Sequence, residues 1–105
     1  MFIAIYQFDI KPEKRDQFVQ SWKELTQLIY EFEGSLGSRL HRESEIRYIA
    51  YAQWPNRDRW KHSGDQLPEE ANTWRAQMKE ACTEIKTLHA LEMDEDLLKN
   101  EPFRG

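Results

Sequence analysis

Sulfur, clustered positive charge and long apolar runs are all scarce in this 105-residue chain, and each scarcity excludes a class of protein. Cys82 is the only cysteine, so no disulfide can form within the chain and no thiolate metal framework is possible. The histidines, His41, His62 and His89, lack the close repeated spacing of metal ligands. We therefore predict no metal site and a reducing, cytoplasmic location.

Positive charge is dispersed along the chain, whose formal net charge is -4. Nucleic acids and anionic membrane surfaces both draw proteins through clustered lysines and arginines, and no such cluster is present. We predict neither kind of partner. The first ten residues are apolar but alternate as in a strand, and they are followed by Lys11-Pro12-Glu13 and not by a small-residue cleavage site, so we also expect no signal peptide and no membrane span.

Large aromatic side chains are plentiful by contrast, and they make up 12% of the chain against 32% charged residues. A chain with this many large apolar groups is expected to fold, and its length fits one domain. We predict a single domain over residues 1–105, with a core at 2–93 and a tail at 94–105 that has no clear period.

Two periodicities alternate along the chain and predict its elements. Residues 2–10 alternate as in a strand, and apolar residues then recur at helical spacing from Phe18 to Phe32 until Gly34. Further strands are expected at 35–42, 47–54 and about 83–93, a short helical turn at 56–62, and a second main helix from about 67 to 81. This order predicts an α+β, ferredoxin-like fold, with a four-stranded antiparallel sheet and both main helices on one face.

The other face of that sheet would carry large apolar side chains in either orientation. It would expose either Phe2, Tyr6, Phe8, Tyr48 and Trp54, or Ile3, Ile5, Ile49 and Tyr51. An exposed apolar patch on the order of 400 Å² is unusual for a monomer. We therefore expect two copies to pair through their open sheet faces across a two-fold axis, as a homodimer.

Residues 34–42, Gly-Ser-Leu-Gly-Ser-Arg-Leu-His-Arg, form a glycine-flanked second strand. They are followed by the aromatic stretch 48–55, which closes in Trp54-Pro55, and by a short helix that begins at Asn56. This pattern resembles the antibiotic biosynthesis monooxygenase family over residues 2–93. The resemblance implies a dimeric α+β barrel that oxygenates a small aromatic or quinol-type molecule without metal, flavin or other cofactor.

Haem-degrading members of this family place an asparagine on the first strand, a tryptophan after the short helix and a histidine on the second main helix. The matching positions here are Gln7, Ser63 and a residue near Thr73. Since no histidine lies near Thr73, the resemblance implies no haem site of the family's kind.

A cofactor-free oxygenase needs a base, groups that stabilise an anion and a dry pocket. The predicted base is His41 or His89, and Arg39 and Gln7 are the predicted anion stabilisers. If their face turns toward the helices, one cavity between sheet and helices would be lined by Gln7, Arg39, His41, Tyr51 and His89. The alternative is that Arg39 and His41 sit on a sheet edge in solvent, with Tyr51 in the core.

Trp60 and Trp74 flank a Ser-Gly-Asp break at 63–65, where a loop could open, so both are predicted to wall the substrate pocket. Trp22, at helical spacing, is predicted to be core. Two other functions stay open on the same residues. One is a non-catalytic small-molecule-binding or stress-related dimeric module, and the other is a proton-transfer isomerase.

Overall fold

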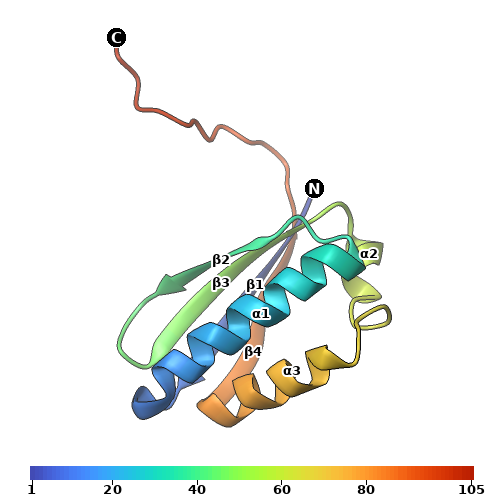
Figure 1. Cartoon of the computed structure of the whole chain (residues 1–105). Helices are drawn as coiled ribbons and strands as arrows, with labels where there is room; N and C mark the ends of the chain where they lie inside the picture. The colour runs from blue at the N-terminus through green and yellow to red at the C-terminus, as the bar shows by residue number, and fades with distance from the viewer.

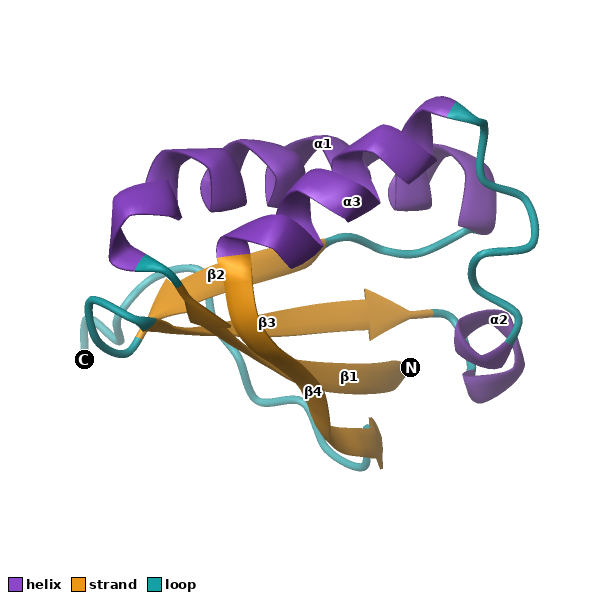
Figure 2. Ribbon diagram, turned by 90° about the horizontal axis from the view of Figure 1, so that it is seen from below, coloured by secondary structure: helices purple, strands orange, loops and turns teal.

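A computed structural model describes all of residues 1–105, and it contains the predicted four-stranded antiparallel sheet. The strands lie in the order β2-β3-β1-β4, and every neighbouring pair is antiparallel. The helices α1 and α3 lie together on one side of this sheet, and α2 lies at its end (Figures 1 and 2). The ferredoxin-like α+β prediction is confirmed. The elements are β1 (Phe2–Ile10), a 3-10 turn (Pro12–Lys14), α1 (Arg15–Glu33), β2 (Ser38–Arg42), β3 (Arg47–Trp54), α2 (Arg57–Lys61), α3 (Glu70–Ala81) and β4 (Cys82–Glu92).

Local signals place most of the element ends. Gly34 ends α1 in the left-handed conformation, with φ of 75°, which a residue with a Cβ adopts at a cost. Asn56 caps α2, because its side-chain oxygen accepts a hydrogen bond of 2.9 Å from the Arg59 amide. The strand β2 begins at Ser38 and not at the expected Ser35, since Gly37 at φ 94° interrupts the extended backbone.

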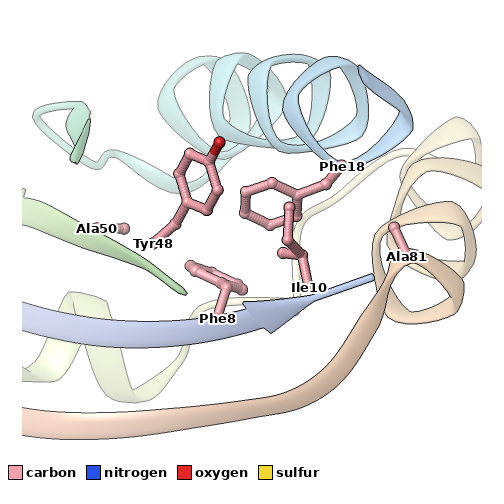
Figure 3. Packing of buried hydrophobic residues seen from close by; sticks show 6 residues of the cluster. All are labelled: Phe8, Ile10, Phe18, Tyr48, Ala50 and Ala81. Atoms are coloured by element: carbon pink, nitrogen blue, oxygen red, sulfur yellow. The ribbon is translucent and has the colours of Figure 1, made fainter. Parts of the chain in front are cut away.

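Aromatic packing joins α1 to the covered face of the sheet, which we call the inner face. Phe18 of α1 is completely buried between Phe8 and Tyr48, with ring centroids 5.2 and 5.3 Å away (Figure 3). The Tyr48 hydroxyl accepts a hydrogen bond of 2.9 Å from Arg15 Nε, so this buried phenol has a partner. Because side chains alternate along a strand, the even-numbered residues of β1 and β3 face the helices.

The opposite face, which we call the outer face, has no helix over it (Figure 2). Its centre is aliphatic, with Ile3 and Ile5 from β1 beside Ile49 from β3 and Leu91 from β4. Of the two possible apolar sets, the isoleucine set is therefore the one that the helices leave uncovered. Leu91 is 46% exposed in the single chain.

The tail after β4 runs away from the domain as an extended segment (Figure 1). Its apolar residues, Leu97, Leu98 and Phe103, are 80, 71 and 91% exposed. No helix of the structure combines the length with the apolar character that crossing a bilayer requires.

Candidate active site

A cavity of about 190 Å³ lies between the inner face of the sheet and α1. Its floor is formed by aromatic residues at both ends and two alanines between them, so side chains that stop at Cβ leave the space open. Its roof is one stripe of α1 with Met78 of α3. The floor consists of Tyr6, Phe8, Ala50, Ala52 and Trp54, and the α1 stripe of Trp22, Leu25, Thr26 and Ile29.

The polar groups of this cavity are neutral. Hydroxyls come from Thr26, Ser35, Ser38 and Ser63, and no aspartate, glutamate, histidine, lysine or arginine is among the lining residues. A site of this composition suits a largely apolar, uncharged ligand with a few oxygen atoms. Apart from the serine and threonine alcohols, Tyr6 is the only lining residue whose side chain carries an ionisable group.

Tyr6 is tied to α2 by a hydrogen bond across the end of the domain. Its hydroxyl oxygen accepts from Trp60 Nε1 at 2.7 Å, and the Trp60 ring packs on Phe2 with centroids 5.1 Å apart. Burial raises the pKa of Tyr6, and the bond from Trp60 opposes that shift only in part. Tyr6 is therefore a neutral phenol at physiological pH.

Trp54 brings an indole to the cavity floor. The residue is 4% exposed, and its Nε1 is the one buried side-chain nitrogen or oxygen in the chain that has no hydrogen-bond partner. An unpaired buried donor is costly, and such groups in native structures call for an explanation.

The predicted polar constellation lies on the other side of the sheet. Residues paired directly across strands share a face, and Gln7 is in register with Ile49, which is paired with His41. Ile5 is likewise in register with Tyr51 and His89. The prediction of one cavity between sheet and helices is thus wrong, because a strand's period of two puts the whole set outward. All five predicted residues, Gln7, Arg39, His41, Tyr51 and His89, share the outer face.

Gln7 is buried on that face, and its side-chain amide donates hydrogen bonds to a neighbouring carboxylate. Its Nε2 lies 3.3 Å from both carboxylate oxygens of Asp9, which Arg47 also holds through Nε at 2.8 Å and Nη2 at 3.2 Å. The hydrogen bond from Arg47 holds the pKa of Asp9 below its usual range. Gln7 therefore supports an ion pair within the sheet. Arg39, His41 and His89 are exposed in the single chain. For Arg39 and His41 this agrees with the alternative prediction that they lie at a sheet edge in solvent.

The tryptophan predictions also need correction. Trp74 packs against the cluster of Leu25, Leu28 and Ala71, and Trp60 reaches the cavity only through Tyr6. The indoles in the lining are those of Trp22 and Trp54. Helical spacing correctly placed Trp22 on the buried stripe of α1, but spacing alone does not distinguish a residue that packs from one that borders a hollow.

A larger and more open cleft of about 400 Å³ lies between the end of α1 and the segment around α2. It is mostly polar, and its opposite charges, such as Arg59 and Asp58, offset one another. Its buried Glu33 accepts hydrogen bonds from the amides of Gly64 and Gln66, so it holds the segment that places Ser63 at the apolar cavity. The smaller cavity is the better candidate site, because it lies between the two layers of the fold and borders side chains whose hydrogen-bond donors have no acceptor in the protein.

Comparison with known proteins agrees with this architecture. The model of the antibiotic biosynthesis monooxygenase family matches residues 1–66, which include β1 to α2. No curated protein matches the sequence. Among solved structures, SnoaB from Streptomyces nogalater, described as a cofactor-independent oxygenase, superposes with a TM-score of 0.71 at 14% identity, over 93% of this chain and 97% of that one. Rv0793 from Mycobacterium tuberculosis gives 0.71 at 13% identity, over 92% and 98%. The structural likeness shows a shared fold, and the sequence match shows the kinship: this chain belongs to the antibiotic biosynthesis monooxygenase family.

Proposed function

We propose that this protein oxygenates a small aromatic or quinol-type molecule with O₂, without metal or flavin, in the cavity under α1. The family supports a monooxygenase-type activity. The observation that carries the proposal is the largely apolar cavity of about 190 Å³ between sheet and helix, which is bordered by two indoles and a neutral phenol. Such a cavity suits a flat aromatic ring.

The reaction proposed is R₂CH₂ + O₂ → R₂C=O + H₂O at a carbon activated by its own ring system. Loss of a proton gives an anion delocalised onto a ring oxygen, and this anion passes electrons to O₂. A hydrogen-bond donor at that oxygen stabilises the anion. Since no side-chain base lines the cavity, solvent takes the proton from a substrate that its own ring system makes acidic. His41, His89 and Arg39 lie across the sheet from this cavity, so they would act only at a separate site on the outer face that a second subunit completes.

Oxygen uptake on a panel of hydroquinones and ring-activated methylene compounds tests the proposal. We expect turnover in air, none under nitrogen, and, for the methylene compounds, one atom of ¹⁸O from ¹⁸O₂ in each product ketone. Ala52→Leu should abolish it by filling the cavity, while exposed Leu97→Ala should not. Equal product with and without oxygen, or no product in either, would remove the oxygenase.

We propose further that two copies pair through their outer faces. The aliphatic centre of that face is bounded at one end by the Asp9–Arg47 ion pair, which suits an interface with an apolar core and a polar rim. Sedimentation of the full chain at micromolar concentration should give twice 12.7 kDa. A folded species at the monomer mass would contradict the pairing.

The neutral lining favours one alternative over another. A binding module needs no base, and the cavity offers none, so saturable ligand binding without turnover is the second candidate. A proton-transfer isomerase needs a base at its substrate, and only Tyr6 is available there. Quenching of tryptophan fluorescence by a flat ligand, with no oxygen uptake and no exchange of its C–H protons, would select the binding module.

A further inference from the structure

We infer that Tyr6 is the ligand-recognising hydrogen-bond donor of the cavity and that Trp60 sets its direction, so that the bound molecule presents a carbonyl, quinone or phenolate oxygen to Tyr6. The inference rests on the proposed function only in taking this cavity as the ligand site. It goes further in naming the residue that selects the ligand and the group that the ligand must carry.

The bond between Tyr6 and Trp60 has only one possible direction. An indole nitrogen donates and cannot accept, so the Tyr6 oxygen is the acceptor of the 2.7 Å bond. The Tyr6 hydrogen then needs another acceptor, and no backbone or side-chain atom of the chain takes it. Tyr6 lines the cavity, so a ligand oxygen that reaches its hydroxyl can accept this hydrogen.

Two contacts hold Trp60 in place. Phe2, which is fully buried, packs on the Trp60 ring, and the Asn56 cap fixes the first turn of α2. A donor that is oriented before the ligand arrives loses little entropy on binding. Burial also keeps the phenol protonated, so Tyr6 donates and does not act as an anion.

Trp54 is a second lining residue with an unpaired donor. Its buried Nε1 has no partner, and its side chain forms part of the same floor as Tyr6. The Tyr6 hydroxyl and the Trp54 Nε1 are both hydrogen-bond donors without an acceptor in the protein, so this lining suits an acceptor oxygen on the ligand and not a cation. The volume of about 190 Å³ limits the ligand to one ring or a compact bicycle, because a cavity of roughly 150 Å³ holds benzene.

A matched pair of inert probes isolates the hydrogen bond. The bicyclic ketone α-tetralone and its oxygen-free analogue tetralin have nearly the same shape, and neither needs turnover to be measured. By equilibrium dialysis we expect the wild-type protein to bind both, and Tyr6→Phe to weaken α-tetralone about 5- to 10-fold while tetralin stays within about twofold. Tyr30→Phe, at an exposed position on α1, is the matched control and should change neither affinity.

Trp60→Phe provides a second, independent variant if Tyr6→Phe unfolds. It keeps an aromatic ring on Phe2 but frees the Tyr6 hydroxyl to rotate, so we expect a selective loss of about threefold for α-tetralone. Equal losses for both probes, or no loss for α-tetralone, would overturn the role of Tyr6. If the wild-type protein binds neither probe, the cavity is not a ligand site, and the proposed function fails together with the inference.

Discussion

The two faces of the sheet are built from the same strands and do different work. The inner face is aromatic and covered by helices, and its alanines leave a hollow bordered by neutral hydroxyl and indole groups. The outer face is aliphatic, and charged and imidazole groups surround its centre. The residue types usually associated with catalysis thus lie where a second copy is expected to pack. The inner face offers shape and hydrogen bonds instead.

The largest expected effect is on the inner face. Phe18→Ala removes a fully buried ring between two others, so unfolding in urea should show a loss of about 3–5 kcal/mol. Phe103→Ala, in the exposed tail, should stay within about 0.5 kcal/mol. A loss below about 1 kcal/mol for Phe18→Ala would mean that the inner face does not carry the core.

On the outer face the expected effect is on assembly. Ile49→Glu places a charge at the aliphatic centre, and burying an unpaired carboxylate in a sheet-to-sheet interface is prohibitive. Sedimentation should then give a folded monomer whose circular dichroism matches that of the wild type. Glu31→Gln, at an exposed position on α1 and so on the other side of the sheet, is the control and should leave the assembly unchanged; dissociation by both variants alike would argue against an interface centred on Ile49.

The Asp9–Arg47 pair gives the outer face a dependence on pH. The folded pKa of Asp9 is lowered, so its stabilisation is present above the ordinary carboxyl value of 3.8 and is lost as the pH falls through the lower folded value. Asp9→Asn should therefore lower the melting temperature at pH 7 and flatten its decline below about pH 4. Asp16→Asn, at a fully exposed carboxylate, should change neither; an unchanged slope in Asp9→Asn would contradict the pairing.

The smallest expected effect is chemical. Burial raises the pKa of Cys82 to about 11, so little thiolate exists at pH 8. A disulfide reagent such as DTNB should label native Cys82 at least about tenfold more slowly than the urea-unfolded chain. Equal rates would show that the first residue of β4 is not packed as described.

The sequence predicted the order of elements and much of their boundaries, because the signals involved are local. Gly34 and Asn56 act through their own backbone and side chain, and the 3.6-residue stripe of α1 follows from Phe18, Trp22 and Leu25. Each of these features can be predicted from one segment alone, without knowing which helix or strand packs against it.

The sequence did not show which face of the sheet the helices cover. Residues 2–10 are apolar on both sides, so alternation alone left the inner set undecided. The missed signal is in β3, where Ala50 and Ala52 lie between Tyr48 and Trp54 on one face: small residues on an otherwise aromatic face mark the floor of a hollow. Had that face been turned inward, Tyr6 would have replaced Gln7 as the polar candidate on β1.

Ala50 and Ala52 determine how large a ligand the cavity can hold. Substitution by glycine would deepen the floor and admit a bulkier ring system, while valine would raise it and leave only a filled interior. Neither exchange removes the hydroxyl of Tyr6 or the indole of Trp60. Ligand size and ligand polarity can therefore be altered separately, with two methyl groups governing the first and one pair of side chains the second.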